Sequence, residues 1–586
     1  MNFQHLLHVH ALFAIVGLPG FPCADAVVKV NIPYYTTSDL GNPNDNAASG
    51  NPLKGFLTSP DWSTPPYRQE IPSSLEFYYV GLNEVMTGSD DFDWDTSFEP
   101  MIAETASRNK HAIVRFRMDC PGETTMVPEF LVDNGLVMNS YSTYGGGQSP
   151  DYTDSNLLQA LQGFIAAFGA RYDGDTRIGF IQVGLLGFWG EWHTYTDGSG
   201  LTEGWIPSST KDLIVGAFES AFSITQLQVR YPHQSAVDAG FGLHDDSFAH
   251  STLDGAANGG VVVDWFFWPE VQNAGITDFW KNSTMGSELR PDLQSSIFSD
   301  TYTIGEYKQD FDLCVNTTHA TYCLNYFALA SENGYSGNDL SRAIDSNNRM
   351  GYSFRVTSVS VSEGNAASSV DVAVTIAQFG VAPFYYPLEL TLTCQGGGDL
   401  SLPGVETIIS QGDVKIFTFV NLPATPQCLD DVSITLTSSF AYLGNPVKFA
   451  QGLDGRSVNV ALPLPSLAPS PAPPSCDQND SDIFYRKRKG VGVSQTCNWL
   501  RTRKRWKWKR SLCRATAEGS VDGVLFRSAG EVCFETCEYL KRFRKGSRNK
   551  TCNWLRKKNK EEILKICGDY EDASDTCYLT CKTCPE

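Results

Sequence analysis

The sequence predicts an α/β fold: a (β/α)8 barrel of the TIM type, then a C-terminal antiparallel β-sandwich, a proline-rich linker and a small disulfide-rich module. Three observations lead to this prediction. Apolar, strand-like runs separated by helical patterns or long loops continue to about residue 345, and runs of period two follow to residue 460. Ten of the 16 cysteines then fall within residues 476–586.

The first region carries about eight strand signals, a number and a length typical of a barrel. These runs are rich in β-branched and aromatic residues and lie at 51–56, 75–82, 111–119, 178–183, 235–241, 260–267, 301–306 and 322–327. Helical patterns separate several of them, at 96–109, 155–172 and 209–229. A doubly wound open sheet is the alternative, but no glycine-rich phosphate-binding fingerprint follows the first strand.

The chain divides into five segments. The expected order is a signal peptide at 1–26, the barrel at 27–345, the sandwich at 346–460, the linker at 461–475 and the basic cysteine-rich module at 476–586. The signal peptide is indicated by an apolar run before a small-residue site. No other segment is apolar for the length that a membrane span needs.

Cysteine content and glycosylation signals favour the secretory route. Four Asn-x-Ser/Thr sites occur, at Asn282, Asn316, Asn479 and Asn549. Disulfides persist in oxidising compartments, so we expect a secreted, extracellular or cell-wall protein. Within the barrel and sandwich, Cys314 with Cys323 and Cys394 with Cys428 are the expected local pairs.

The net charge of −21 conceals a split between the body and the tail. Residues 476–586 carry 25 Lys and Arg against 15 Asp and Glu, a net charge of +10, and the residues before them carry −31. The basic run at 501–510 interleaves cations with tryptophans. In an extracellular protein, this pattern favours an anionic polysaccharide or wall matrix as the partner over nucleic acid, although a tail that is merely solvated has the same composition.

One stretch stands out for chemistry, Gly187-Phe-Trp-Gly-Glu-Trp-His193, directly after the fourth predicted strand. Its glycines permit a tight turn at the strand end, and Glu191 lies between two tryptophans. A core glutamate bonded to the backbone of a glycine-rich turn is the alternative interpretation. Glu306 follows the seventh predicted strand, so both glutamates are expected at the C-terminal face of the barrel, where barrel enzymes place their reactive groups.

A pair of carboxylates across a cleft is the minimum apparatus for cleaving a glycosidic bond, and aromatic rings offer sugars apolar faces for stacking. Glu191 and Glu306 are therefore the candidate catalytic residues. The candidate substrate-binding residues are Trp189, Trp192, His193, Arg117, His244, Asp245, Asp246, Asp264 and Trp265. No metal-binding or cofactor motif is present in the barrel, so neither a metal nor a cofactor is expected.

Several blocks of the chain resemble the paired domains of unknown function 4874 and 4832. They are Asn51-Pro-x-x-Gly-Phe56, Phe92-Asp-Trp94, Val114-Arg-Phe-Arg117, the Trp-Gly-Glu-Trp-His block, Gly305-Glu306 and Gln378-Phe-Gly-Val-Ala-Pro-Phe-Tyr385. The resemblance implies a glycosidase-type barrel followed by a sandwich. The barrel also resembles the large clan of retaining glycoside hydrolases, which implies Glu191 as acid/base and Glu306 as nucleophile. Gly190 departs from this pattern, because the clan usually has Asn before the acid/base.

The tail repeats itself, since Cys497-Asn-Trp-Leu-Arg recurs as Cys552-Asn-Trp-Leu-Arg. Its ending, Cys577-x-x-x-Cys-x-x-Cys584, resembles the six-cysteine ShK-like toxin fold, whose first-to-last pairing would imply a bond between Cys476 and Cys584. The leading hypothesis is therefore a secreted, glycoside hydrolase-like enzyme that acts on poly- or oligosaccharide and is anchored by its tail. A non-catalytic carbohydrate-binding or wall-structural protein is the competing hypothesis.

Overall fold

The computed structural model describes residues 28–30, 50–194, 201, 205–364, 369–394, 398–405, 414–423, 425, 429–451 and 455–462, together with the backbone of six short strands between 483 and 551. The predicted signal peptide, the linker and most of the tail lie outside these residues. The chain forms two units, one of residues 26–466 and one that includes residues 467–586. Among the described helices, none is both long and apolar enough to cross a membrane.

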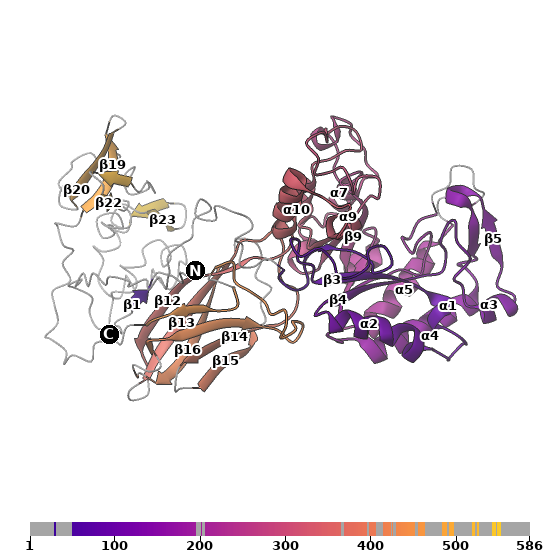
Figure 1. Cartoon of the computed structure of the whole chain (residues 1–586), viewed down its shortest axis with the longest axis horizontal. Helices are drawn as coiled ribbons and strands as arrows, with labels where there is room; N and C mark the ends of the chain where they lie inside the picture. Colours follow the sequence, from indigo (N-terminus) through magenta and orange to yellow (C-terminus); the bar gives the residue numbers. More distant parts are fainter. Residues whose placement is uncertain are drawn as a thin grey trace, which may run out of the picture. The chain divides into compact units, whose positions relative to one another are not determined.

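Eight parallel strands form the predicted barrel (Figure 1). In barrel order they are β2 (Gly55–Leu57), β3 (Leu75–Gly81), β4 (His111–Arg117), β7 (Ile178–Gln182), β8 (Gln226–Val229), β9 (Gly242–Phe248), β10 (Met285–Leu289) and β11 (Tyr322–Leu324). From β4 onward each strand pairs with its predecessor in this order, and β11 pairs with β2 through Tyr322 and Gly55.

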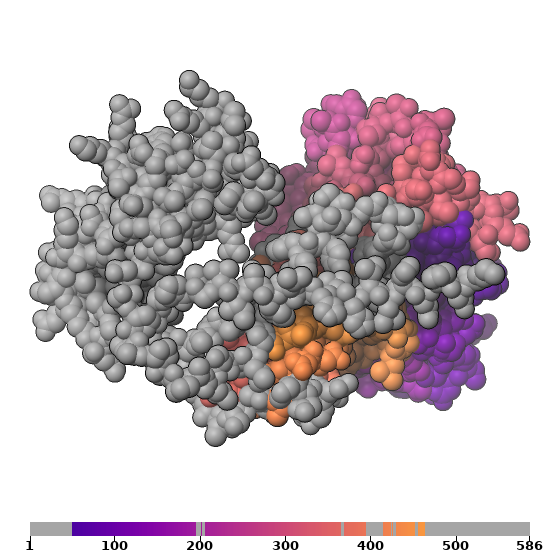
Figure 2. Space-filling view, turned by 60° about the vertical axis from the view of Figure 1, so that its left-hand side comes forward, coloured from indigo at the N-terminus to yellow at the C-terminus, as the bar shows by residue number. Residues whose placement is uncertain are grey.

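The sheet closes between β2 and β3. Thr58 bridges to Glu76, and the backbone N–H of Phe77 donates to the carbonyl oxygen of Thr58 at 3.0 Å. In Figure 2, indigo surface from the N-terminal part of the barrel lies beside salmon surface from its later part. The fold-class prediction is therefore confirmed for the barrel.

Helices follow the strands and cover the barrel, and Figure 1 shows α2, α4 and α5 on the outer side of β3 and β4. The helices are α1 (Leu82–Val85), η2 (Trp94–Phe98), α2 (Glu99–Ser107), α3 (Glu129–Asp133), η3 (Thr143–Gly145), α4 (Ser155–Tyr172), α5 (Ser208–Ala221), α6 (Gln234–Asp238), η4 (Ala256–Asn258), α7 (Phe267–Asn273), η5 (Phe279–Lys281), α8 (Phe311–Thr318), α9 (Tyr326–Leu329) and α10 (Gly337–Arg349). The predicted helix at 155–172 is confirmed in full as α4. A hairpin of β5 (Met138–Tyr141) and β6 (Gly147–Pro150) interrupts the connection that precedes it.

Three predicted strands are wrong, and three real strands were not predicted. Residues 235–241 form the short helix α6 and a turn, and residues 260–267 form a loop in which Val262 is 77% exposed. Residues 301–306 lead into a turn closed by Gly305 and Lys308. The fifth, sixth and seventh barrel strands are instead β8, β9 and β10. Strand β8 falls inside the predicted helix at 209–229, because α5 ends at Ala221 and the chain turns back into the barrel.

The sandwich is confirmed as two antiparallel sheets of four strands each. One contains β1 (Val28–Val30), β12 (Phe354–Glu363), β13 (Ser369–Gln378) and β16 (Val414–Pro423), and the other contains β15 (Gly398–Val405), β14 (Leu388–Cys394), β17 (Val432–Thr437) and β18 (Val458–Val460). Strand β1 precedes the barrel in sequence and pairs with β12. The sandwich therefore takes one strand from the N-terminal side of the barrel.

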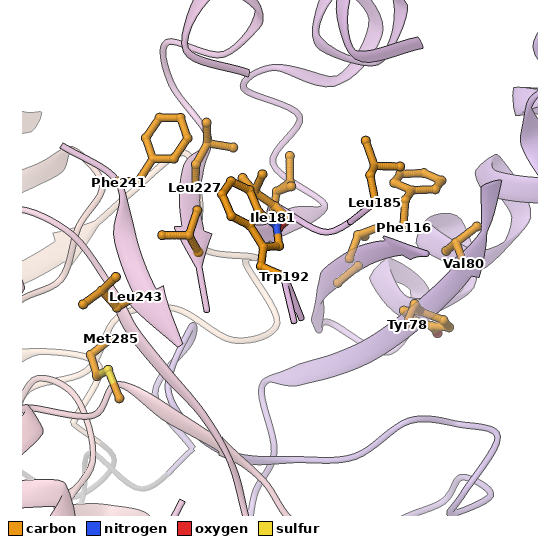
Figure 3. Close-up of a cluster of buried hydrophobic side chains, with 14 of the residues drawn as sticks. Tyr78, Val80, Phe116, Ile181, Leu185, Trp192, Leu227, Phe241, Leu243 and Met285 are labelled. Atoms are coloured by element: carbon orange, nitrogen blue, oxygen red, sulfur yellow. The ribbon is translucent and has the colours of Figure 1, made fainter. Parts of the chain in front are cut away.

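Two large cores hold this unit together. One lies between the barrel strands and their helices, and Figure 3 shows part of it, including Phe116, Ile181, Leu185 and Leu227. The other joins buried side chains of the barrel strands to the interior of the sandwich, with Phe180 of β7 and Val374 of β13 in the same cluster. Barrel and sandwich thus share buried apolar surface.

The cysteines differ in part from the expectation. Cys120, Cys314 and Cys323 are buried free thiols, so the predicted pair of Cys314 and Cys323 is wrong. Cys314 lies on α8 and contacts Gln309, whereas Cys323 lies on β11 and contacts the carbonyl oxygen of Leu324. The predicted pair of Cys394 and Cys428 and the pairings of the tail lie outside the described side chains. In the tail, the backbone forms three hairpins: β19 (Ile483–Arg488) with β20 (Val491–Thr496), β21 (Gly519–Val521) with β22 (Val524–Phe526), and β23 (Arg542–Lys545) with β24 (Arg548–Thr551).

Candidate active site

Charged side chains from four strands gather at the carboxyl ends of the barrel strands. Arg115 lies on β4, Glu191 follows β7, Asp246 lies on β9 and Glu288 lies on β10. In a barrel of parallel strands, these ends meet on one face. The contacts below join the four side chains into one network.

The loop after β7 has an unusual backbone. Trp189 and Trp192 have φ values of 53° and 62°, although neither is glycine. Such a left-handed conformation costs about 1–2 kcal/mol per residue, and strain of this kind is typical of functional sites. At Gly187, a Cβ atom would come within 2.5 Å of the carbonyl oxygen of His193, so only glycine fits. The loop is therefore held in a strained, tight turn around Glu191.

Glu191 makes two charged contacts. Its Oε1 lies 3.6 Å from Nη1 of Arg115, and its Oε2 lies 3.3 Å from Nε2 of His193. The side chain of Glu191 remains 15% exposed, so solvent still reaches the carboxylate. Trp192 departs from its expected role, because it is only 2% exposed and its indole N–H donates to the carbonyl oxygen of Val183 at 2.7 Å. Its ring supports the loop from inside the core (Figure 3) and offers no surface for a sugar.

Arg115 is the centre of the network and is completely buried. Its Nε donates to Oε1 of Gln182, and its Nη2 donates to Oδ2 of Asp246, each at 2.8 Å. Burial alone would lower the pKa of Arg115, but the carboxylates of Asp246, Glu191 and Glu288 raise it. The guanidinium therefore stays charged and fixes the position of the acids around it.

Glu288 is the second carboxylate of the site. It lies on β10, and the hydroxyl group of Tyr79 donates to its Oε2 at 2.8 Å. Burial raises the pKa of Glu288 to about 8, and the negative charges of Asp246 and Glu191 add to the shift while Arg115 opposes it. A carboxyl group of this kind holds its proton at neutral pH, which is what general acid–base chemistry needs.

Asp246 and His244 form a buried pair on β9. Nδ1 of His244 lies 2.8 Å from Oδ1 of Asp246. Burial would raise the pKa of Asp246, but the charges of Arg115 and His244 hold it well below its usual range. Burial is also the main reason why the pKa of His244 is lowered. The pair therefore supplies a fixed negative charge beneath Arg115.

Asp245 is fully buried and satisfied within the fold. Its Oδ1 accepts from the backbone N–H of Ser247 at 3.0 Å, and its Oδ2 accepts from the hydroxyl group of Thr252 at 2.7 Å. Nη2 of Arg230, which directly follows β8, lies 3.3 Å from Oδ1. Burial raises the pKa of Asp245, and Arg230 opposes that shift. These contacts give Asp245 a supporting place behind the site.

Glu306 does not come directly after the seventh strand, which corrects the expectation from the sequence: β10 ends at Leu289, and Glu306 lies farther along the connection to α8. It is exposed in the turn between Gly305 and Lys308. The backbone N–H of Tyr307 donates to Oδ1 of Asn258, which attaches this turn to the loop after β9. Because the seventh strand is β10, the carboxylate that occupies the expected position is Glu288.

The remaining predicted residues lie around the strand ends. Trp189 is partly buried, with its ring centroid 6.1 Å from that of His193. The guanidinium of Arg117 lies 4.9 Å from the ring centroid of Tyr79. Asp264 and Trp265 are exposed on the loop after β9, and Trp265 packs against Phe266. No contact found in the described part of the chain joins Asp264 or Trp265 to the carboxylate network.

Asp119 adds a further acid near Glu191. It follows β4, is 1% exposed and accepts from the hydroxyl group of Tyr141 at 2.5 Å. Burial raises its pKa to about 6, while the bond from Tyr141 and the charge of His193 oppose the shift. The backbone N–H of Trp189 donates to the carbonyl oxygen of Asp119, which joins the third and fourth strand ends.

Sequence reasoning missed Arg115, Tyr79 and Glu288. A signal was available for Arg115, because Arg115 and Arg117 alternate in an otherwise apolar run and therefore point to the same side of the strand. No comparable signal marked β10, since Gly and Ser precede Glu288 and glycine is depleted in strands.

No protein-family model matches the chain, and no curated protein sequence matches it. Solved structures give distant similarity. Endo-glycoceramidase II from Rhodococcus sp., with a five-membered iminocyclitol, is 11% identical at a TM-score of 0.30 over 65% of this chain and 99% of that chain. A family 39 glycoside hydrolase from the gut symbiont Bacteroides cellulosilyticus WH2 gives 10% identity and a TM-score of 0.31 over 64% of this chain and 82% of that chain. The tri-modular endo-β-1,4-glucanase B from Bacillus halodurans gives 8% identity and a TM-score of 0.32 over 67% of this chain and 83% of that chain. At these low values, the similarity carries no conclusion about the reaction, which is inferred below from the residues themselves.

Proposed function

We propose that this chain is a glycoside hydrolase that cleaves a poly- or oligosaccharide with Glu191 and Glu288 as its carboxylate pair. One observation supports this more than any other. Glu191 follows the fourth barrel strand, Glu288 lies on the seventh, and Arg115 with its bound Asp246 connects them electrostatically. Two carboxyl groups at the same end of the barrel, one of them protonated at neutral pH, are what hydrolysis of a glycosidic bond requires.

Glu288 holds a proton near neutral pH. Burial raises the pKa of Glu288 to about 8, and the negative charges of Asp246 and Glu191 add to the shift. For catalysis, the proton is needed on the acid and the negative charge on the nucleophile, so it must pass to Glu191 when substrate is bound.

The proposed reaction has two steps and retains the anomeric configuration. Glu288 forms a bond to the anomeric carbon while the glycosidic C–O bond breaks, and the leaving oxygen takes the proton of Glu191. Glu191 then removes a proton from water, whose oxygen displaces Glu288 and releases the sugar. The nearby His193 and Arg115 orient Glu191 and stabilise its ionised form after the first step.

Three matched variants test the assignment. Glu191→Gln and Glu288→Gln are each expected to lower kcat by about 10³-fold, within the range for loss of a general acid or base, with unchanged circular dichroism. Glu306→Gln should keep wild-type activity, because Glu306 lies in an exposed turn. Activity is measured as reducing ends released from soluble polysaccharides. Full activity of either site variant, or loss of activity in Glu306→Gln, would reject the proposed pair.

Two further measurements separate the alternatives. The anomer released first, followed by nuclear magnetic resonance, distinguishes retention from inversion, and inversion would remove the covalent step. Saturable glycan binding without any reducing ends, even after long incubation, would instead support the competing hypothesis of a carbohydrate-binding or wall-structural protein. The resemblance to domains of unknown function 4874 and 4832 remains a prediction and is not needed for this test.

A further inference from the structure

Trp62 is an exposed aromatic residue beside Glu288. It follows β2 and is 45% exposed, and its ring centroid lies 5.9 Å from that of Tyr79. Tyr79 in turn donates its hydroxyl hydrogen to Glu288. The guanidinium groups of Arg115 and Arg117 lie 5.2 and 4.9 Å from the ring centroid of Tyr79 and fix that ring. The indole of Trp62 thus packs against the ring that hydrogen-bonds Glu288, while nearly half of Trp62 is exposed to solvent.

Tyr144 is a comparable residue on the side of Glu191. It lies between β5 and β6 and is 53% exposed, and its ring centroid lies 5.2 Å from that of Trp189. Trp189 packs near His193, whose Nε2 contacts Glu191. The φ angle of Tyr144 is 54°, a left-handed conformation that costs about 1–2 kcal/mol for a residue with a side chain. The ring of Tyr144 is therefore exposed next to that of Trp189.

A single exposed aromatic residue needs no explanation. Here each carboxylate of the pair is connected to a ring that is about half exposed, Glu288 through Tyr79 to Trp62, and Glu191 through His193 and Trp189 to Tyr144. Flat aromatic faces are the surfaces on which sugar rings stack. In the proposed reaction, attack by Glu288 places the sugar that is attacked on the side of Trp62, and protonation by Glu191 places the leaving group on the side of Tyr144.

We propose that the substrate is a glycan chain that extends on both sides of the cleaved bond, with one sugar stacked on Trp62 and another on Tyr144. This inference rests on the proposed function and adds to it the mode of action, which is cleavage within a chain rather than removal of a terminal sugar. Both binding surfaces, Trp62 and Tyr144, are aromatic rings, so the sugars that stack on them are pyranose rings with an apolar face.

Binding is measured by calorimetry in the Glu191→Gln background, so that hydrolysis does not interfere. The probes are the hexaoses and the disaccharides of β-1,4-glucose, β-1,3-glucose, β-1,4-xylose and β-1,4-mannose. For at least one series, the hexaose should bind at least tenfold more tightly than the disaccharide. Trp62→Ala and Tyr144→Ala should each raise the Kd of that hexaose about tenfold, equal to about 1.4 kcal/mol, and change the Kd of the disaccharide less than about twofold.

Matched controls separate stacking from folding. Trp62→Phe and Tyr144→Phe keep an aromatic face and should bind the hexaose within about threefold of the parent. Phe379→Ala removes a ring that is 46% exposed on the sandwich and should have no effect. The proposal is overturned if no hexaose in the panel binds more tightly than its disaccharide, or if both alanine variants bind like Phe379→Ala. Tight hexaose binding without cleavage by the wild type would reject the proposed hydrolysis but keep the extended binding surface.

Discussion

The two ends of the barrel strands differ in chemistry although they belong to the same strands. On β4, Ile113 belongs to the apolar core shared with the sandwich, whereas Arg115 lies in the carboxylate network. On β7, Phe180 lies in that same core and Gln182 accepts a hydrogen bond from Arg115. Two residues along a strand therefore separate a packed, dry base from a charged site.

This difference shows how the sandwich contributes to the site without reaching it. Tyr386 from the sandwich donates its hydroxyl hydrogen to the carbonyl oxygen of Gly179 at the start of β7, and its ring centroid lies 6.3 Å from that of Phe180. The base is thus closed by apolar side chains and hydrogen bonds. The carboxylate network lies at the opposite ends of the strands, where Glu191 is 15% exposed to solvent.

The largest expected effect is at the charged end. Arg115→Met leaves the buried Asp246 without its main counter-charge, and breaking a buried ion pair costs about 3–5 kcal/mol of folding free energy. Activity should fall by about 10³-fold or more, because Glu191 loses the same cation. Chemical denaturation and polysaccharide hydrolysis measure the two effects.

A double variant tests this prediction even if Arg115→Met folds poorly. Arg115→Met with Asp246→Asn removes both charges and should recover much of the stability but no activity. Recovery of activity in the double variant would show that Arg115 serves only to neutralise Asp246.

The next largest effect is expected in the apolar core that the barrel shares with the sandwich. Phe180 is 1% exposed, and Phe→Ala in a core costs about 3–5 kcal/mol. Phe180→Ala should therefore lower the free energy of unfolding strongly while the kcat of the folded fraction stays within about threefold of wild type. A fall in kcat as large as that of Arg115→Met would mean that the two ends are not independent.

The pH dependence of activity and of stability also distinguishes the charged site from the apolar core. Because the pKa of Glu288 is raised to about 8, Glu288 loses its proton above that pH, so kcat/KM should fall about tenfold per pH unit there. The free energy of unfolding is also expected to fall as the pH rises. The unfolded chain loses this proton near pH 4.5 and the folded chain near pH 8, so the contribution of Glu288 declines as the pH rises through this window. Glu288→Gln should abolish that decline, measured as Tm against pH, whereas Phe180→Ala should keep it.

The smallest effect on the barrel is expected from the tail, which belongs to a separate unit. We propose that the protein is secreted and that its basic tail binds an anionic polysaccharide or wall matrix. Deletion of residues 476–586 should remove retention on immobilised heparin at low salt and leave hydrolysis unchanged. Retention of the full chain that persists at 1 M salt would contradict an electrostatic interaction.

Strong local patterns predicted the first half of the barrel well. The runs around β3, β4 and β7 combine β-branched and aromatic residues, so their apolar content marks them as strands. The helix α4 carries apolar residues at helical spacing over its whole length. Glu191 was predicted as a candidate catalytic residue for a related reason, because the glycines around it indicate a turn at a strand end.

The second half of the barrel was predicted poorly because its strands are short and polar. In β10, Gly286 is required by a neighbour far along the chain, since a Cβ atom there would lie 2.2 Å from the hydroxyl oxygen of Tyr322. The valines at 261–263 resemble a strand but lie in a loop after Gly259 and Gly260, which both have positive φ. The error in this region displaced the second carboxylate from Glu288 to Glu306.

The sequence alone determined the fold class and the sandwich and indicated one of the two proposed carboxylates, because periodicity and glycine placement are local properties of the chain. Only the tertiary structure identified Glu288 and its partners Arg115 and Tyr79. Their meeting depends on strand register and on compensation of buried charge by side chains from other strands, and neither leaves a pattern within a short stretch of sequence.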